Sequence, residues 1–127
     1  MSKSKQKGTQ FETWVAEYCK GFGYPDAERL ALKGKDDQGD VRVNRNAHLE
    51  CKAGNAAHNA SYQQCRIWLA EAITEGQRAG VPCYLVVKRK GHGKTSVGLS
   101  RVFAWADQGF MVEFTLDDLL SHVIEAD

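Results

Sequence analysis

Two short segments of alternating side chains, joined by turn-forming residues, limit most strongly how this chain can fold. Residues 40–44 read Asp-Val-Arg-Val-Asn, and residues 47–52 read Ala-His-Leu-Glu-Cys-Lys. Successive side chains of a strand point to opposite faces, so Glu50 and Lys52 share one face of the second segment. The stretch from Asn44 to Ala47 is rich in turn formers and can reverse the chain. The pattern therefore predicts a β-hairpin.

This hairpin brings three chemically useful side chains together. Val41 and Val43 supply the apolar face of its first strand. Pairing of the two strands then places Asp40 beside Glu50 and Lys52. Two carboxylates at that separation form an oxygen site that suits Mg²⁺. A lysine next to such a cation can orient a water molecule and stabilise negative charge on a phosphate.

A simpler interpretation of the same side chains is an exposed hairpin face with a weakly stabilising cross-strand ion pair. The flanking segments favour a site instead. A glycine-rich acidic loop over residues 34–39 leads into Asp40, and small residues follow Lys52, which leaves open space around the charges. Within that loop, Asp36 and Asp37 are alternative metal ligands, or simply members of a polar loop.

Helix and strand patterns on both sides of the hairpin predict an α/β domain. Apolar residues recur at helical spacing from Phe11 to Phe22 and again from Tyr62 to Gln77. The continuous apolar run over residues 83–87 is typical of a strand buried on both faces. We expect a central mixed sheet flanked by helices. The remaining expected elements are strands over residues 27–32, 97–105 and 111–114 and a last helix over residues 115–123.

The start of the first helix leaves two roles open for Glu12. The segment Thr9-Gln10-Phe11-Glu12 matches a capping box, in which the glutamate reaches back to the Thr9 amide. A helical wheel also puts Glu12 at the edge of the apolar stripe, so that it can lean toward the sheet. Residues 1–7 are expected to form a flexible basic arm in front of a single domain over residues 8–127.

The composition bounds the class of protein. The chain has 127 residues, enough for one core, and a net charge of +1. No apolar run approaches the ~20 residues needed to span a bilayer, and no apolar segment follows the first residues as in a signal peptide. We therefore expect a cytoplasmic protein that binds no membrane. Its four cysteines show no C-x-x-C pairing, which favours buried reduced thiols over a zinc site: Cys19, Cys51, Cys65 and Cys83.

The order and spacing of the hairpin residues resemble the motif of the PD-(D/E)XK nuclease superfamily. In that motif an aspartate at a strand start is followed, on the next strand, by (Asp/Glu)-x-Lys. Asp40 and Glu50-Cys51-Lys52 match it in this chain. At Gly39 the chain departs from the pattern, which has proline there.

Within the superfamily, the chain looks most like a small Holliday junction resolvase of the archaeal and viral type. Further points of likeness are a glutamate on the early helix (Glu12), a Gly23-Tyr24 turn after that helix, and Glu28-Arg29 opening the next segment. A helix and an apolar strand then follow the lysine. The resemblance covers roughly residues 8–90.

The resemblance implies a restriction-endonuclease-like core and a metal-dependent reaction. Mg²⁺, for which Mn²⁺ can substitute, would be held by Asp40, Glu50, the backbone carbonyl of Cys51 and Glu12. Lys52 would orient the attacking water. The implied activity is hydrolysis of phosphodiester bonds in four-way DNA junctions by a homodimer, in DNA recombination and repair. If the chain is virus-encoded, it would act in the cytoplasm of the host cell.

Two alternatives stay open at this point. One is another nuclease of the same superfamily, of the restriction, nicking or repair type. The other is a non-catalytic DNA-binding module whose carboxylates are structural.

Local basic clusters are the expected DNA contacts, because phosphate binding needs a basic surface rather than a basic chain. His92, between two glycines, is a further candidate for phosphate contact, or part of an ordinary loop. The segment Gly91 to Ser96 lacks the spacing of a phosphate-binding loop, so no nucleotide cofactor is expected. The residues assigned to DNA are Lys3, Lys5, Lys7, Lys33, Lys35, Lys88, Arg89, Lys90 and Lys94.

Overall fold

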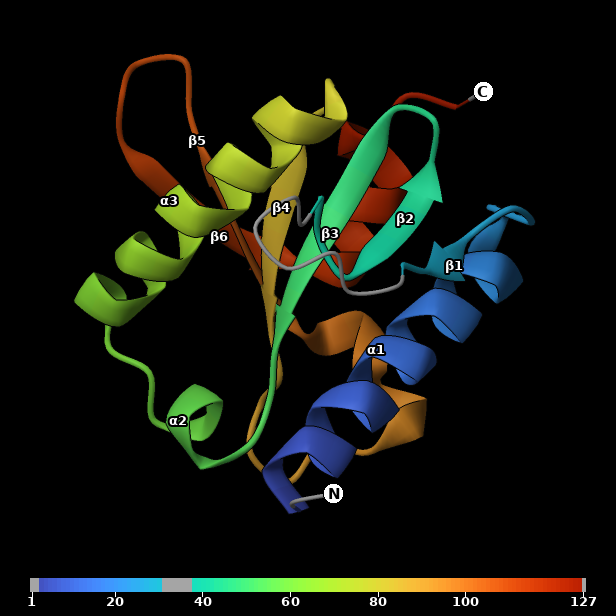
Figure 1. The fold of residues 1–127 in the computed structure, drawn as a ribbon, viewed down its shortest axis with the longest axis vertical. Helices are drawn as coiled ribbons and strands as arrows, with labels where there is room; N and C mark the ends of the chain where they lie inside the picture. The colour runs from blue at the N-terminus through green and yellow to red at the C-terminus, as the bar shows by residue number, and fades with distance from the viewer. Residues whose placement is uncertain (1–2, 31–37, 127) are drawn as a thin grey trace.

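The protein has an α/β fold built on one open sheet (Figure 1). The structure, a computed structural model, describes residues 3–30 and 38–126. Its sheet has six strands in the order β1-β2-β3-β4-β5-β6. Their bounds are β1 Glu28–Arg29, β2 Val41–Asn44, β3 Ala47–Lys52, β4 Cys83–Val87, β5 Arg101–Trp105 and β6 Met111–Thr115.

The sheet is mixed, as expected. The pair β3–β4 is parallel, and the other pairs along the sheet are antiparallel. Parallel neighbours need a long crossover. Two helices supply it, α2 (Asn55–His58) and α3 (Tyr62–Ala79). The predicted α/β class with a central mixed sheet flanked by helices is thus confirmed.

Helices cover the two faces of the sheet and bury a separate apolar cluster on each. Helix α1 (Lys3–Phe22) lies on one face, together with the 3-10 helix η2 (Lys94–Leu99). The chain ends on that face with α4 (Leu116–Asp118) and the π-helical turn η3 (Leu119–Val123). Helix α3 covers the opposite face through Leu69 and its neighbours. The middle strands are therefore buried from both sides.

The predicted hairpin is confirmed, with the predicted boundaries to within a residue. Val41 pairs with Leu49 and Arg42 with His48. The turn is held by Asn44, whose side-chain oxygen accepts the Asn46 N–H at 2.8 Å. The period-2 alternation of the sequence succeeds here because one face of each strand is buried, which specifies the register strongly.

The predicted start of the first helix is wrong. Helix α1 begins at Lys3, so Thr9 lies inside it and cannot cap it. The Thr9 carbonyl accepts the Thr13 hydroxyl at 3.0 Å, a contact one helical turn long. Residues 3–7, which were assigned to a basic arm, form the first turns of this helix instead. Glu12 therefore has no capping role.

Other elements differ from expectation in extent. The strand expected over residues 27–32 is described as β1, Glu28–Arg29, and residues 31–37 lie outside the described part. The strand expected over residues 97–105 begins only at Arg101, after the 3-10 helix η2. The last helix begins where it was predicted to begin, and the Thr115 hydroxyl caps it by accepting the Asp118 N–H at 3.1 Å. No helix of the described residues is both long and apolar enough to cross a membrane.

Candidate active site

Asp40 lies at the start of β2 and is tied to β3 through both its backbone and its side chain. Its N–H donates to the Leu49 carbonyl at 2.8 Å, which extends the hairpin ladder by one residue. Its carboxylate accepts the Cys51 N–H at 2.7 Å. The Glu50 carboxyl, in turn, is hydrogen-bonded to Asp40. The hairpin thus brings together the two acids that the sequence predicts to be neighbours.

Gly39 allows this approach, since its backbone takes a conformation that favours glycine. Its φ is +108°, and a Cβ built on it would lie 3.1 Å from the Leu49 carbonyl oxygen. Proline fixes φ near −65° and cannot adopt this conformation. The departure from the superfamily pattern at this position is therefore also a departure in backbone geometry.

Glu50 has a second acidic neighbour that the sequence did not reveal. Its side chain is buried, with 6% of its surface exposed, and it is hydrogen-bonded to Glu75 of α3, which is also buried. Burial raises the pKa of Glu50 to about 8, the Glu75 contact adds to the rise, and Asp40 and Lys52 oppose it. The Glu50 carboxyl therefore keeps its proton to higher pH than an exposed glutamate does.

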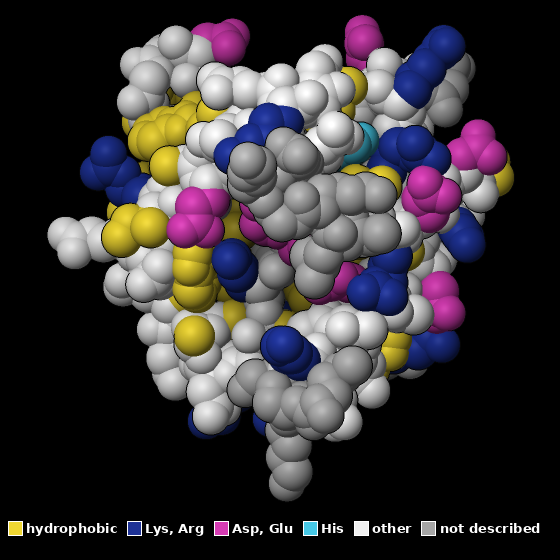
Figure 2. Space-filling view, in the orientation of Figure 1, with side chains coloured by type: hydrophobic (Ala, Val, Ile, Leu, Met, Phe, Trp, Pro, Cys, Tyr) yellow, Lys and Arg dark blue, Asp and Glu magenta, His cyan; other side chains and the backbone are white. Residues whose placement is uncertain are grey.

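Lys52 is directed toward α3. Its Nζ lies 3.7 Å from Glu71 Oε2 and 5.5 Å from the centre of the Trp68 ring. It is close enough to Glu50 to lower the pKa of that carboxyl. The lysine therefore shares a face with Glu50, as predicted, and carries an ion pair with a surface carboxylate. Figure 2 shows acidic and basic side chains next to one another across the middle of this view of the molecule.

Cys51 points to the opposite face, toward α1. Burial raises the pKa of its thiol well above the usual range, and the charges of Asp40, Glu12 and Glu50 raise it further. The thiol therefore stays protonated, which argues against a role as nucleophile. Because the charge of Glu12 acts on the Cys51 thiol, the Glu12 side chain of α1 lies near Cys51 of β3. Glu12 also forms an ion pair with Arg29, at 3.3 Å.

The Cys51 carbonyl lies on the side of β3 that faces β2. In a strand, the N–H and C=O of one residue point to the same neighbouring strand. The Cys51 N–H donates to Asp40, so its carbonyl points to the β2 side, while the Lys52 carbonyl faces β4 and accepts the Lys88 N–H at 2.9 Å.

The donors fit a cation that prefers oxygen and keeps part of its water shell. Among the described residues no group of three His, Cys, Asp or Glu side chains could by itself hold a metal ion. Two carboxylates in hydrogen-bond contact, Asp40 and Glu50, remain. Mg²⁺ is commonly bound by one or two carboxylates with waters completing its shell. The set therefore matches Mg²⁺ better than a metal that needs a complete protein cage.

The basic residues assigned to DNA divide into different groups. Lys5 and Lys7 are exposed on the first turns of α1, and the side chain of Lys3 is outside the described part. Lys90 is exposed and Lys88 is half-buried in the loop after β4. Lys94 forms an ion pair with Glu17 at 3.2 Å. Lys33 and Lys35 lie outside the described residues, as do the alternative metal ligands Asp36 and Asp37.

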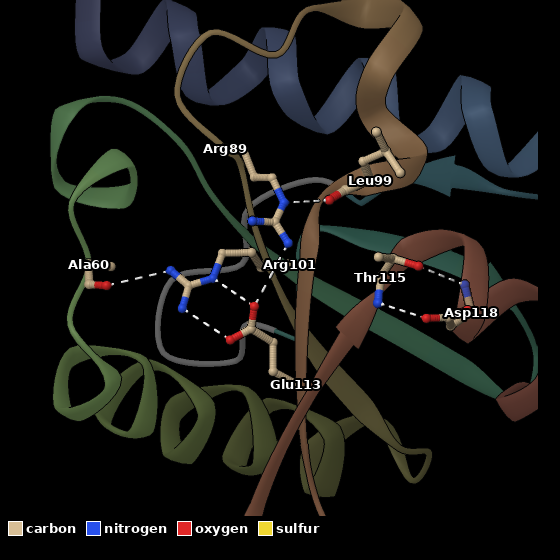
Figure 3. A network of polar contacts seen from close by, with 7 residues as sticks. All are labelled: Ala60, Arg89, Leu99, Arg101, Glu113, Thr115 and Asp118. Carbon is tan, nitrogen blue, oxygen red and sulfur yellow. Dashed lines mark hydrogen bonds and ion pairs between the residues drawn. The ribbon is translucent and has the colours of Figure 1, made fainter.

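Arg89 makes contacts within the protein that the sequence does not reveal. Its Nε donates to the Leu99 carbonyl at 2.8 Å, and its guanidinium lies 3.9 Å from Glu113 (Figure 3). Arg101 donates to both oxygens of Glu113, at 3.0 and 3.2 Å. Arg89 therefore belongs to a network that ties the loop after β4 to β5 and β6. The basic run in the sequence conceals this difference between Arg89 and Lys90.

The residue missed by sequence reasoning is Glu75. The apolar stripe of α3 was traced through residues such as Leu69 and Ala72, and an acid on the same helix reads as a solvated position. A usable signal was nevertheless present. Glu71 and Glu75 are spaced four residues apart, so they share the helix face that lies over Lys52 and Glu50.

The comparisons with known proteins add no relative. No protein-family model matches the sequence, no curated protein matches it, and no solved structure matches the fold.

Proposed function

We propose that the protein is a Mg²⁺-dependent DNA endonuclease whose active site is formed by Asp40, Glu50 and Lys52. The observation that supports this most is the contact between the Asp40 and Glu50 carboxyls at the hairpin, with Lys52 two residues further along the same face. The fold would be a variant of the PD-(D/E)XK core. Its sheet order and single parallel pair are compatible with that core.

The cation would be held by Asp40, Glu50 and the Cys51 carbonyl, and it would supply Lewis-acid activation of water and charge neutralisation at the phosphate. The protein's residues have distinct tasks around it. The Cys51 N–H holds the Asp40 carboxylate in place at 2.7 Å. Glu50 must lose its proton for the cation to bind, so the raised pKa of Glu50 sets the pH at which the site is filled.

Lys52 would orient the attacking water and offset negative charge on the transition state. For this, its ammonium must turn from Glu71 toward the scissile phosphate. The 3.7 Å ion pair joins a lysine side chain that is 29% exposed to a glutamate that is 53% exposed. Such a pair is weak, so an incoming phosphate can compete for the lysine. Glu12 would complete the acidic set from α1 once Arg29, at 3.3 Å, is displaced.

We propose branched DNA, a four-way junction above all, as the substrate. The sheet and its helices account for the described chain, which leaves no added module to read a base sequence. Selectivity would then come from the shape of the DNA through contacts to its phosphates. Lys5, Lys7 and Lys90 are exposed and suited to this.

Two symmetric cuts at a junction require two active sites, and therefore a homodimer. The apolar side chains of the β5–β6 hairpin fall into two groups. Val102, Phe103 and Met111 are buried in the core, whereas Trp105 and Phe110 are exposed by 38% and 54%. Exposed aromatic residues are typical of interfaces. The β5–β6 hairpin is thus the proposed dimer surface. In Figure 2, hydrophobic side chains, drawn in yellow, gather over the neighbouring helix α3.

A labelled four-way junction, incubated with Mg²⁺ and compared with linear duplex, tests the proposal. The expected result is paired symmetric cuts in the junction, lost in Asp40→Asn while DNA binding persists. Cleavage of linear duplex at equal rate would instead indicate a general nuclease of the same superfamily.

The second candidate is a non-catalytic DNA-binding module. The engagement of Lys52 with Glu71 and of Glu12 with Arg29, and the burial of Glu50, favour it. Mg²⁺-dependent nicking that disappears in Asp40→Asn would exclude this candidate.

A further inference from the structure

A surface pocket of about 470 Å³ lies at the carboxyl end of β4, outside the carboxylate site. Three elements form it: α2 with His58, the loop after β4 with Lys88, Lys90 and His92, and the ends of β5 and β6. Its lining also includes Arg89, Arg101 and Glu113. The pocket is therefore unusually rich in groups that can carry positive charge or donate hydrogen bonds.

The single carboxylate in this lining is already neutralised. Glu113 accepts two hydrogen bonds from Arg101 and lies 3.9 Å from Arg89 (Figure 3). That contact raises the pKa of Arg101, against the effect of its partial burial. The network thus fixes the wall of the pocket. Lys88 Nζ donates to the Arg89 carbonyl at 3.3 Å, and the positive charge of Lys88 and Lys90 is not offset by the one carboxylate of the lining.

The positive charges around the pocket act on His58. Partial burial lowers the pKa of His58, and the charges of Lys88, Lys7 and Lys90 lower it further. Lys7 comes from the start of α1, so three segments remote in sequence combine at this end of the molecule. In Figure 1 the start of α1, α2 and the chain after β4 all lie toward the bottom of the view.

His92 supplies an unused polar atom at the same place. Its backbone N–H donates to the Arg89 carbonyl at 3.3 Å, closing a turn in which Gly91 has φ +77°. Its ring Nδ1 is buried and has no hydrogen-bond partner among the described residues. Buried polar atoms are nearly always paired, so this Nδ1 is open to a bond with a water molecule or a ligand.

The pocket adjoins the candidate active site through the sheet. Lys52, Val87 and Arg101 pair in one row across β3, β4 and β5. Two strand spacings, roughly 10 Å, therefore separate the Lys52 and Arg101 backbones. One strand of DNA rises ~3.4 Å per nucleotide, so this distance corresponds to roughly three nucleotides. The Lys88 N–H donates to the Lys52 carbonyl at 2.9 Å, which fixes the loop relative to the lysine.

We propose that His58, Lys88, Lys90 and His92 form a binding site for a backbone phosphate of DNA, a few nucleotides from the phosphate at Lys52. This inference rests on the proposed function, because that function identifies DNA as the ligand. The site would hold the DNA strand next to the phosphate that is cleaved. The two lysines supply charge, and the two histidines supply directed hydrogen bonds.

Histidine-ring NMR of the whole protein, without divalent cation, tests the site. Of the chain's four histidines, His48 and His122 lie outside the pocket and serve as internal controls. A short DNA duplex should shift the ring signals of His58 and His92 and leave those of the controls unchanged. Binding of DNA without movement of His58 and His92 would overturn the proposal.

Inorganic phosphate at the same ionic strength is the second probe. Shifts of the His58 and His92 rings with DNA alone, or with both probes, support a site for a backbone phosphate. Shifts with inorganic phosphate alone would assign the pocket to a small anion and overturn the DNA version.

A salt titration with a matched pair of variants completes the test. Lys90→Gln should reduce the slope of log affinity against log salt by about one. Lys20→Gln changes an exposed lysine at the other end of α1 and should leave the slope unchanged. Equal slopes for the two variants would contradict the proposal. These binding readouts need no cleavage, so a protein that binds through the pocket yet cuts no DNA would remove the proposed activity alone.

Discussion

The Glu50 carboxyl of β3 forms a hydrogen bond with the Glu75 carboxyl of α3, and both side chains are buried. Two buried acids can lie this close only if a proton or a cation is shared between them. Burial, with help from Glu75, accordingly raises the pKa of Glu50 to about 8. The pair connects the stability of the fold to pH and, under the proposed function, to metal binding.

Replacing Glu50 by Gln should remove a pH dependence of stability. The folded state holds the Glu50 proton up to about pH 8, whereas the unfolded chain releases it near the usual value of 4.5. The stabilisation is therefore complete below pH 4.5 and is lost as the pH rises toward 8, by at most ~1.4 kcal/mol per pH unit. In Glu50→Gln this loss is absent, so the variant should be more stable than wild type at pH 8 and similar at pH 5.

Urea unfolding at both pH values, in EDTA, measures this difference. Glu71→Gln is the matched control, since Glu71 is exposed on the same helix. Parallel pH profiles for wild type and Glu50→Gln would show that the Glu50–Glu75 pair carries no such linkage.

Glu75→Gln should shift the pH dependence of Mg²⁺ binding downward. Glu75 raises the pKa of Glu50 through its hydrogen bond and its charge, although burial is the larger cause. Removing the charge lowers the pKa of Glu50 part of the way, so the cation displaces the proton at lower pH. Calorimetric titration with Mg²⁺ between pH 6 and 8.5 measures the apparent affinity. An unchanged midpoint would mean that Glu75 does not act on Glu50.

Gly39→Ala should destabilise the protein by roughly 1–3 kcal/mol. The residue has φ +108°, and its new Cβ would approach the Leu49 carbonyl to 3.1 Å. Gly109→Ala is the control, because Gly109 also has positive φ, +92°, but nothing lies within 4 Å of its Cβ position. The larger loss is expected at residue 39, and Gly39→Pro should be worse than Gly39→Ala. Thermal melts that rank the two alanine variants in the reverse order would contradict the close approach.

Arg89→Gln and Lys90→Gln should differ in stability although the residues are neighbours. Arg89 donates to the Leu99 carbonyl and lies near Glu113, so its loss should cost about 1 kcal/mol. Lys90 is exposed, and its replacement should change stability by less than ~0.5 kcal/mol. Chemical denaturation of both variants checks this. Equal stability would mean that the network of Figure 3 contributes little.

The hairpin and its acids were predictable from the sequence because alternation and burial agree there. Val41, Val43 and Leu49 are fully buried, so a register slip would expose all three. The capping box at Thr9 was misleading, since the same letters occur inside a helix that starts six residues earlier. A local pattern cannot reveal a helix that continues through polar residues.

Contacts between segments that are distant in the sequence could not be predicted either, because a local pattern carries no information about them. Glu75 meets Glu50 only because α3 folds back across the sheet, and Arg89 meets Glu113 only because β4, β5 and β6 are neighbours. The spacing of Glu71 and Glu75 shows only that they share a helix face, and the pairing of Arg89 with Glu113 leaves no trace in the local spacing of residues. The sequence therefore predicted that the acids of the hairpin are neighbours, but not that Glu75 lies beside Glu50 and adds to the rise of its pKa.

The measurement that tests the central claim most directly is cleavage of a labelled four-way junction at pH 8 with Mg²⁺, by wild type and by Asp40→Asn. We predict paired cuts by wild type and a loss of at least roughly 10³-fold in Asp40→Asn, with junction binding retained. A folded wild-type protein that cuts neither junction nor duplex, or an Asp40→Asn variant that cuts as fast as wild type, would contradict the assignment of the active site.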